Sequence, residues 1–324
     1  MNVAAFVLLA GMLGAYVILD GYDLGVGAIH LLFSRDDSER SASFEAIGPF
    51  WNGNEVFLIA SGAVLFALFP RAYAAAFSGF YLPFVIVLWL LMVRGMSIEL
   101  RGHFTSDLWR GFWDVAFCLS SALLAFVLGV AIGNVVRGVP LNEAGYFAGT
   151  FGFLLNGYAL AVGALSLFAL AMHGAAFLWM RADARYHARA RRFVRASLAI
   201  AGVLFIGVTA ASLHEPRGGA HAVLWIAPAI ALAALFAVGF AKNGTQALTA
   251  SSVFLLAVMA SAAQTIFPYV LPALASGRGI DIYNAAPNAY SVGTAFTAAI
   301  IGVGAVLAYG TIAAVRLLRA RESG

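Results

Sequence analysis

Nine apolar segments recur along the sequence, and only short polar connections separate them. A membrane-spanning helix needs about 20 mostly apolar residues, because its backbone polar groups must be paired within the segment. The segments lie near residues 3–33, 49–70, 73–100, 112–136, 150–180, 193–213, 222–241, 248–271 and 291–316. Only 10% of the 324 residues are charged, against about a quarter in a soluble protein. The sequence therefore predicts an all-α polytopic membrane protein whose residues 1–324 form a single integral membrane domain.

The basic residues predict how the chain crosses the membrane, because Lys and Arg are enriched in cytoplasmic connections. Of the 19 basic residues, 15 lie at the odd-numbered connections, at the adjoining helix ends and in the C-terminal tail. They are Arg35, Arg40, Arg94, Arg101, Arg110, Arg181, Arg185, Arg189, Arg191, Arg192, Arg195, Lys242, Arg316, Arg319 and Arg321. The even-numbered connections hold only Arg71, Arg137, Arg217 and Arg278. We expect the N-terminus outside and the C-terminus in the cytoplasm.

Composition also narrows the function. The formal net charge of +4 is typical of basic membrane-helix ends and gives no reason to expect a nucleic-acid partner. Cys118 is the only cysteine, so neither an internal disulfide nor a multi-cysteine metal cluster is expected. The sequence has no Walker loop, zinc motif, catalytic triad or dinucleotide fingerprint. We therefore predict no catalytic, cofactor-binding or metal-ligating residue in this chain.

Polar residues inside the first three predicted helices are the main candidates for function. Asp20, Asp23 and His30 follow one another at helical spacing, so they share a face of the first helix. Asn52 and Glu55 share a face of the second helix, and the third ends with Arg94 and Glu99. An ionisable group in a bilayer is costly and by default marks a functional site.

Two interpretations of these residues remain open. In the first, Asp20, Asp23 and Glu55 relay protons along a path from the cytoplasm, and Asn52, Asn54 and His30 support a water chain. In the second, the acids form an internal ion-pair network that fixes helix register, with Arg94 and Glu99 as the candidate partners, for instance Asp23 or Glu55 with Arg94. Intramembrane acids serve both purposes in known proteins.

His173 lies within the fifth predicted helix and raises the question of a heme ligand. A bis-histidine heme needs two histidines at matching depth, or a histidine with a methionine. The other histidines lie mostly near helix ends or in connections. We expect His173 to cap a helix or to form an interhelical hydrogen bond.

Several segments resemble subunit II of the cytochrome bd-type quinol oxidases. They are LDGYDLGVGAIH, GPFWNGNEVFLIASGAVLFALFPRAYAAAFSGFYLPF and VRGMSIELRGH, with TIFPYVLPALASG further on. The resemblance implies two four-helix bundles plus a peripheral helix, in a heterodimer with a heme-bearing subunit I in a bacterial cytoplasmic (inner) membrane. Such complexes oxidise quinol and reduce oxygen to water, which generates a proton motive force. Subunit II is credited with assembly, heme stability and delivery of cytoplasmic protons.

The resemblance also implies which groups belong to the complex. Heme b and heme d, or b-type hemes alone, are expected in subunit I and none is ligated by this chain. Quinol is the substrate, and small single-helix subunits, membrane lipid and a structural quinone are further partners in some members. Asp23 matches an acid proposed for a proton pathway. Asn52 stands where other members have Asp, and Glu55 where they have Gln, so we hypothesise that Glu55 supplies the carboxylate missing at Asn52.

The main alternative from another class is a proton-coupled secondary transporter. Such proteins have inverted repeats and paired broken helices around a midplane site. Pro83 and Pro228 fall in predicted helices that would correspond in two repeats. The acids, however, cluster in one half of the chain, which favours the oxidase subunit.

Overall fold

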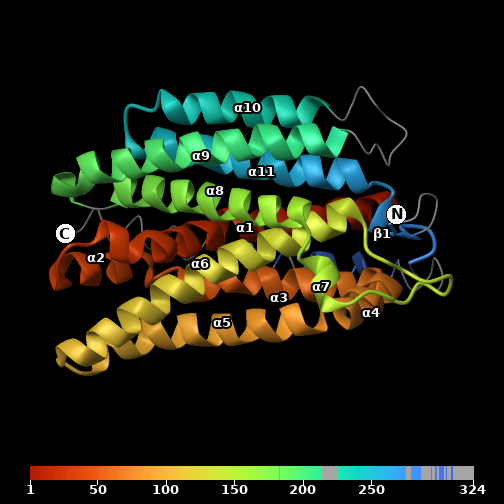
Figure 1. Ribbon diagram of the computed structural model, residues 1–324, viewed down its shortest axis with the longest axis horizontal. Coiled ribbons are helices and arrows are strands. Elements are labelled where there is room, and N and C mark those ends of the chain that lie inside the picture. The colour runs from red at the N-terminus through yellow and green to blue at the C-terminus, as the bar shows by residue number, and fades with distance from the viewer. Residues whose placement is uncertain are drawn as a thin grey trace.

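The computed structural model describes residues 1–181, 183–213, 225–274 and 279–285, with scattered residues between 293 and 308. The long helices run side by side in one bundle (Figure 1). The helices are α1 (Asn2–Phe33), α2 (Asp37–Ile47), α3 (Trp51–Leu68), α4 (Pro70–Gly79), α5 (Tyr81–Leu100), α6 (Asp107–Arg137), α7 (Phe151–Leu154), α8 (Gly157–Arg181), α9 (His187–Leu213), α10 (Ile226–Gly239) and α11 (Gly244–Ile266). Short 3₁₀ turns cover Arg101–His103 and Ala184–Tyr186.

Seven of these helices are long and apolar enough to cross a membrane: α1, α3, α5, α6, α8, α9 and α11, with α5 extended through the 3₁₀ turn to His103. The multi-pass helical class predicted from the sequence is therefore confirmed. The seventh predicted segment, 222–241, corresponds to the shorter apolar helix α10, which has 14 residues. The ninth, 291–316, lies mostly outside the described residues.

Three segments predicted as continuous helices are interrupted or end early in the structure. The segment 73–100 is interrupted at Phe80, because Pro83 in the first turn of α5 has no N–H for the Gly79 carbonyl and its ring would clash there. The segment 150–180 is interrupted before Gly157, where the Asn156 side chain caps α8 by accepting from the Ala159 N–H at 3.0 Å. The segment 248–271 ends at Ile266, because Pro268 forces an extended backbone on the residue before it.

The charged connection after the first helix contains an unexpected helix, α2. Asp36 caps it by accepting a hydrogen bond from the Glu39 N–H at 2.9 Å, and Glu39 accepts from the Arg35 N–H at 2.8 Å. An acidic cap followed three residues later by Glu is a recognised signal for a helix start, so the sequence contained the information. We name the end of the bundle that carries α2 the basic end. The connections 101–106, 183–186 and 240–243 lie at the same end (Figure 1).

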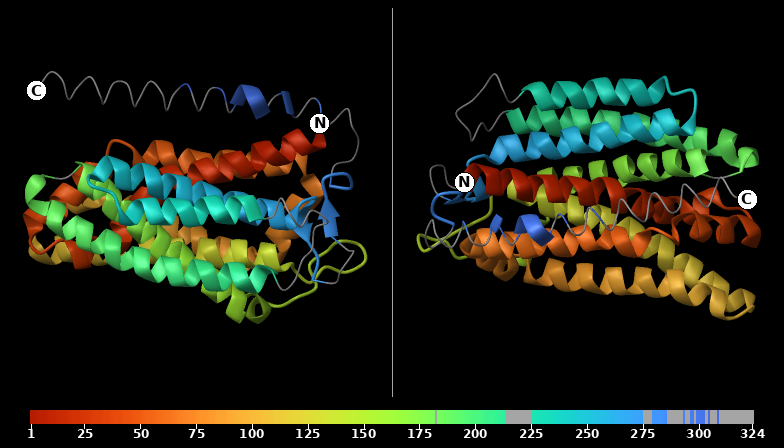
Figure 2. Two further views of the ribbon diagram at one scale, coloured as in Figure 1. Left: turned by 90° about the horizontal axis from the view of Figure 1, so that it is seen from above. Right: turned by 180° about the vertical axis from the view of Figure 1, so that it is seen from behind.

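At the opposite end, β1 (Tyr269–Pro272) pairs antiparallel with β2 (Gly279–Asp281). The connection after α6 joins this ribbon through Val139, which exchanges backbone hydrogen bonds with Pro272 and Leu274, both at 2.9 Å. We name this end the strand end. The small sheet and the connection after α6 lie across this end of the helices (Figure 2).

Helix α1 is the central element and packs against α3, α6, α8 and α11. Its glycines make this packing close. A Cβ on Gly25 would overlap the backbone carbonyl of Leu170 in α8, and a Cβ on Gly174 would overlap the α1 backbone at Gly25 and Val26. The α1 and α8 backbones are therefore in direct contact, as small residues permit in membrane helices.

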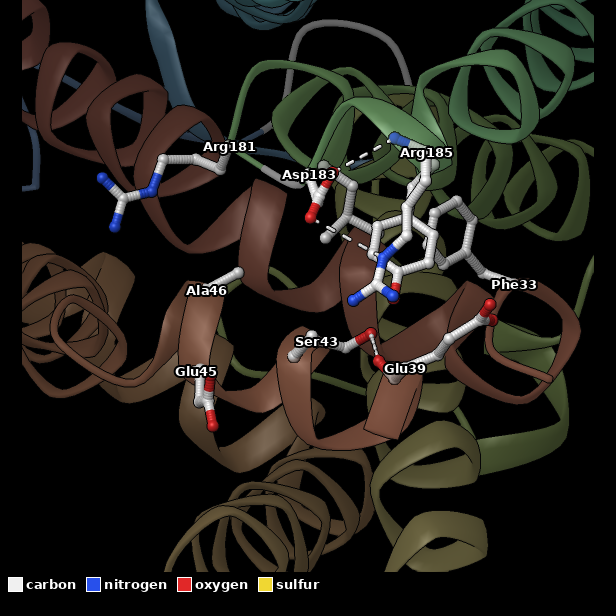
Figure 3. A pocket seen from close by; sticks show the side chains of 11 residues that line it. Phe33, Glu39, Ser43, Glu45, Ala46, Arg181, Asp183 and Arg185 are labelled. Carbon is white, nitrogen blue, oxygen red and sulfur yellow. Dashed lines mark hydrogen bonds and ion pairs between the residues drawn. The ribbon is translucent and has the colours of Figure 1, made fainter. Parts of the chain in front are cut away.

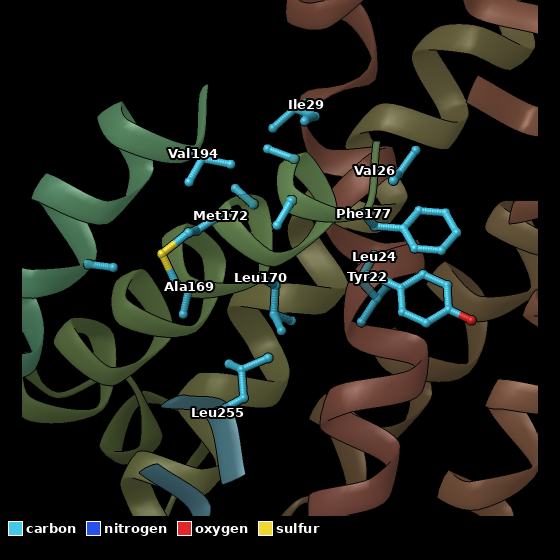
Figure 4. Packing of buried hydrophobic residues seen from close by; sticks show 14 of the residues in the cluster. Tyr22, Leu24, Val26, Ile29, Ala169, Leu170, Met172, Phe177, Val194 and Leu255 are labelled. Carbon is cyan, nitrogen blue, oxygen red and sulfur yellow. The ribbon is translucent and has the colours of Figure 1, made fainter. Parts of the chain in front are cut away.

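An apolar core surrounds this contact and extends across α1, α8, α9 and α11 (Figure 4). The Tyr22 ring stacks on Phe177 with centroids 4.2 Å apart. Leu24, Met172 and Leu178 are almost completely buried. This core fixes the depth of α1, and with it the depth of the acidic residues on its other face.

Candidate functional site

A fully buried ion pair joins the middle of α1 to α5. Arg94 Nη1 donates to Asp20 Oδ2 at 2.9 Å, and Nη2 pairs with the other carboxylate oxygen. Both side chains have no exposed surface. The bidentate geometry offsets part of the desolvation that a buried charge pair incurs. Asp20 is therefore held in place by Arg94.

Glu55 in α3 is the second acid at this guanidinium. Its Oε1 lies 3.4 Å from Arg94 Nη1, and its side chain is 23% exposed, whereas Asp20 is completely buried. One arginine thus serves two carboxylates from two different helices. Glu55 is held more loosely than Asp20. Of these two acids, only Glu55 reaches the surface of the chain.

Asp23 lies one turn along α1 and binds a different partner. Asn54 Nδ2 donates to Asp23 Oδ2 at 2.7 Å and also lies 2.8 Å from the Tyr22 hydroxyl and 3.1 Å from the Leu19 carbonyl. An amide NH₂ has two hydrogens, so it cannot fully satisfy three acceptors. Of the two asparagines predicted to support a water chain, Asn54 is buried at this site, whereas Asn52 is exposed.

Four buried polar atoms around these groups have no hydrogen-bond partner in the described part of the chain. They are Tyr16 Oη, Asp23 Oδ1, Glu55 Oε1 and Arg94 Nε. Buried polar atoms in proteins are usually satisfied by another group or by ordered water. We name five residues the acidic cluster: Asp20, Asp23, Asn54, Glu55 and Arg94. Within the described part of the chain, not all polar atoms in and around this cluster have a hydrogen-bond partner.

A second polar cluster lies at the basic end and is organised around Asp114 in α6, which is completely buried. His30 Nε2 lies 3.0 Å from Asp114 Oδ1, Arg101 Nε donates to the same oxygen at 2.5 Å, and Arg40 Nη1 lies 3.3 Å from Oδ2. One carboxylate thus connects α1, α2, the 3₁₀ turn after α5, and α6. We name these four residues the Asp114 junction.

The Asp114 junction continues to the surface through Asp37 at the start of α2. Asp37 accepts from Arg101 Nη2 at 2.7 Å and from Arg110 Nη1 at 2.6 Å, and its side chain is 50% exposed. His30 belongs to this cluster and not to the acidic cluster. Glu99 belongs to neither, since it is exposed and, in the described residues, only its backbone oxygen has a partner, His103.

Asp114 was missed from the sequence, although the signal was present. It is an isolated acid two residues inside the apolar segment predicted at 112–136. Acids in such positions are expected to have a buried partner. Asp20 and Asp23 are two acids one turn apart, whereas Asp114 stands alone near the end of its segment.

A surface pocket of about 290 Å³ lies beside α2, between α1 and α8 (Figure 3). Phe33, Glu39, Arg185 and Tyr186 line part of it. Glu39 is bound by the Arg189 guanidinium, whose Nη2 lies 3.2 Å from Oε1, and this contact lowers the pKa of the Glu39 carboxyl below its usual value. Arg185 lies 3.7 Å from Asp183. Acids and bases alternate around this pocket, so it has no strong preference for either charge.

His173, the histidine considered as a heme ligand, has partners inside the chain. His173 uses both ring nitrogens inside the chain, with Nδ1 2.7 Å from Ser251 Oγ and Nε2 3.0 Å from the Ile18 carbonyl. It therefore links α8 to α11 and α1. His30 has its Nε2 against Asp114, and the described residues contain no group of three or more His, Cys, Asp or Glu that could hold a metal ion.

The fold and these clusters define a multi-pass helical membrane protein with buried acid–arginine sites and no metal-binding group in the residues that the structure describes. Residues 1–316 match the family model described as cytochrome bd terminal oxidase subunit II. The chain therefore belongs to that family, and the resemblance seen in the sequence is confirmed. Membership of this family, with seven apolar helices, indicates a bacterial inner-membrane multi-pass protein.

Individual relatives agree with this assignment. The chain is 36% identical over 204 residues to cytochrome bd-I ubiquinol oxidase subunit 2 of Escherichia coli (strain K12), a match that covers 62% of this chain and 54%, about half, of that relative. It is 32% identical over 304 residues to a probable cytochrome oxidase subunit 2 of Haemophilus influenzae, covering 82% of this chain and 80% of the relative.

A solved structure has the same fold. The bd oxidase from Geobacillus thermodenitrificans contains a chain that superposes with a TM-score of 0.78, covering 98% of both chains at 19% sequence identity. At this identity the match concerns the fold alone. It extends over nearly the whole chain.

Proposed function

We propose that the chain is the non-heme-ligating subunit II of a bd-type quinol oxidase that oxidises quinol and reduces O₂ to water. Its partner is a subunit I that carries heme b with heme d, or b-type hemes alone. Family membership and the identity of the relatives support this proposal. His173, whose two ring nitrogens both have partners inside the chain, is consistent with hemes held elsewhere.

The remaining architecture belongs to the same proposal. Residues 1–324 form one membrane domain of nine spanning helices, arranged as two four-helix bundles plus a peripheral helix, and the chain stabilises subunit I and its hemes. We assign the basic end to the cytoplasm, with the N-terminus outside. The support is the concentration of Lys and Arg at that end, which follows the rule for cytoplasmic connections.

In this proposal the acidic cluster serves proton delivery, and its members have different roles. Asp20 is bound through both oxygens by Arg94 and holds the arginine in position. Asp23 Oδ1 has no hydrogen-bond partner among the described residues, and Glu55 Oε1 has only the long ion-pair contact of 3.4 Å with Arg94. They can accept a proton or a water molecule. This difference between the three carboxylates is the observation that carries the proposal.

Polar atoms between the two clusters support a route from the basic end. His30 Nδ1 and Ser121 Oγ are buried and without hydrogen-bond partners in the described chain. A Cβ on Gly27 would overlap Ser121 Oγ, so this hydroxyl touches α1 between His30 and Asp23. Bridging waters at such atoms would form a hydrogen-bonded path. Asp114 is bound by two arginines and positions His30 rather than carrying the proton.

The test is the quinol-dependent oxygen consumption of the purified complex carrying Asp20→Asn, Asp23→Asn or Glu55→Gln. We expect Asp23→Asn and Glu55→Gln to assemble with normal heme spectra and to turn over at least about tenfold more slowly, as for loss of a positioned proton-transfer group. Asp20→Asn should instead lower the yield of assembled complex. Normal turnover in both Asp23→Asn and Glu55→Gln would leave a purely structural role.

Glu55 and Asn52 provide a matched comparison for the hypothesis that one replaces the other. Asn52→Asp/Glu55→Gln moves the carboxylate by one turn on the same helix and keeps the number of acids constant. If the double variant matches the wild-type rate while Glu55→Gln does not, the exchange is supported. Full activity in Glu55→Gln alone would contradict it.

A further inference from the structure

The cations of the bundle differ in whether they have acidic partners. Four arginines around α1, α2, α5 and α6 are paired. Arg94 binds Asp20, Arg101 and Arg40 bind Asp114, and Arg110 binds Asp37. Arg189 at the start of α9 likewise binds Glu39. The positive charge of these five arginines is balanced inside the protein.

Four cations on the other side of the basic end have no such partner. Arg191, Arg192 and Arg195 lie in the first turns of α9 and are exposed, and Lys242 is exposed in the connection between α10 and α11. None has an acid within ion-pair distance in the part of the chain that the structure describes. The sequence over 184–213 and 225–274 contains no Asp or Glu.

Contacts between helices bring the two segments together. The Arg191 guanidinium lies over the Trp179 ring, 5.8 Å from its centroid, and Gly244 packs against the backbone of Trp179 and Met180. A Cβ on Gly239 would lie 3.5 Å from Leu198 of α9. The α10–α11 connection therefore runs beside the first turns of α9, as Figure 1 shows. Arg191, Arg192, Arg195 and Lys242 form one positive surface, which we name the α9–α10 basic surface.

Exposed apolar side chains continue from this surface along the same two helices. On α9 they are Ile200, Val203 and Ile206, exposed by 42%, 73% and 59%. On α10, Phe236 and Phe240 are exposed by 70% and 71%, with ring centroids 4.9 Å apart. A ligand that satisfies both features needs an anionic group at one end and hydrocarbon along its length.

We propose that the α9–α10 basic surface binds the phosphate headgroup of an anionic phospholipid, with acyl chains along Val203 and Phe236. A role in topology alone requires only positive charge on one side of the membrane. It gives no reason for four cations to share a surface without a single acid beside an apolar face. Guanidinium and ammonium groups at this depth attract anionic headgroups, and Arg binds phosphate in a bidentate manner.

The test is photo-crosslinking of the intact complex in phosphatidylcholine nanodiscs. The probes are phosphatidylglycerol and phosphatidylcholine that carry a diazirine in one acyl chain. Crosslinks are mapped by mass spectrometry to the peptides that contain residues 196–206 and 232–241. We expect the phosphatidylglycerol probe to label these peptides several-fold more than the phosphatidylcholine probe, and this ratio to fall in 0.5 M NaCl.

Two double variants test the surface: Arg191→Gln/Arg192→Gln and Arg195→Gln/Lys242→Gln. Each keeps two of the four cations, so that positive charge remains to direct membrane insertion. Each should lower the labelling ratio to near one, since one surface cation contributes about a factor of five near an anionic membrane. Arg191→Lys/Arg192→Lys keeps the charge and should retain most of the ratio. Arg35→Gln, an exposed cation elsewhere on the basic end, should leave it unchanged.

Three results would overturn the proposal. The first is a ratio near one in the wild-type complex, and the second is an unchanged ratio in both double variants. The third is displacement of the probe by glycerol 3-phosphate as effectively as by unlabelled phosphatidylglycerol, which would identify a site for soluble phosphates. The wild-type ratio and its salt dependence test the proposal even if a variant fails to insert.

Discussion

Removing the charge of Arg94 should destabilise the protein more than removing the charge of Asp20, although the two residues form one ion pair. Arg94→Gln leaves Asp20 completely buried without a cation and also removes the partner of Glu55. Asp20→Asn leaves Arg94 with Glu55, 3.4 Å away. The arginine has a second partner, whereas Asp20 has no second cation among the described residues.

The size of the difference follows from the cost of isolating a buried charge. Breaking a buried pair from one side costs about 3–5 kcal/mol, which we expect for Arg94→Gln. For Asp20→Asn we expect about 1–3 kcal/mol, the cost of a lost buried hydrogen bond. The double variant Asp20→Asn/Arg94→Gln contains neither charge, so it should be more stable than Arg94→Gln alone.

The measurement is the free energy of unfolding of the purified protein in mixed micelles, obtained by titration with SDS and followed by circular dichroism. Arg35→Gln, an exposed arginine, is the control and should lie within about 0.5 kcal/mol of the wild type. The reasoning is refuted if Arg94→Gln costs less than Asp20→Asn. It is also refuted if the double variant loses the sum of the two single effects.

Three further predictions concern packing, the Asp114 junction and pH. Gly25→Ala should destabilise the protein by about 3 kcal/mol or more, because the added Cβ overpacks the contact with α8. Gly11→Ala in the same helix should be neutral or stabilising, because a Cβ there meets nothing within 4 Å. Thermal melting of the two variants compares them. Asp114→Asn leaves two arginines and His30 around a neutral side chain, so it should lower the free energy of unfolding by about 3–5 kcal/mol. Asp107→Asn, at an exposed position at the start of the same helix, should lower it by at most about 1 kcal/mol. The same SDS titration measures both. Because Arg189 lowers the folded-state pKa of Glu39 below its ordinary 4.5, their pair should stabilise the protein fully above pH 4.5 and lose this contribution as the pH falls below it. Glu39→Gln should flatten that part of the pH–stability profile, and an unchanged profile would contradict the assignment.

The long apolar helices could be predicted from sequence because length and hydropathy alone determine them. Their interruptions depended on single residues whose effect is local, and here the prediction failed despite available signals. Pro83 explains the end of α4 at Gly79, and the Asp36–Glu39 cap explains α2. Both follow from hydrogen bonds that one residue withholds or supplies.

Which residues belong to each polar cluster was harder to predict from the sequence. Helical spacing correctly placed Asp20 and Asp23 near each other, but it could not decide which helix supplies the partner of each. Arg94 lies 74 residues from Asp20, and Asn54 lies 31 from Asp23. Which of Asn52 and Asn54 is buried depends on the rotation of α3 about its axis. That rotation is set by the packing of α3 against α1. A single sequence does not show how two helices pack.

The separation between Asp20 and Arg94 also has a consequence for biosynthesis. Asp20 enters the membrane with α1, while its cation is not synthesised until 74 residues later, after α2, α3 and α4. Asp114 completes the contacts of His30 later still, 84 residues after it. We therefore expect α1 to remain beside the translocation machinery, or in contact with water, until α5 arrives. Nascent chains truncated before residue 94 should accordingly leave α1 extractable, and those extended beyond α6 should not.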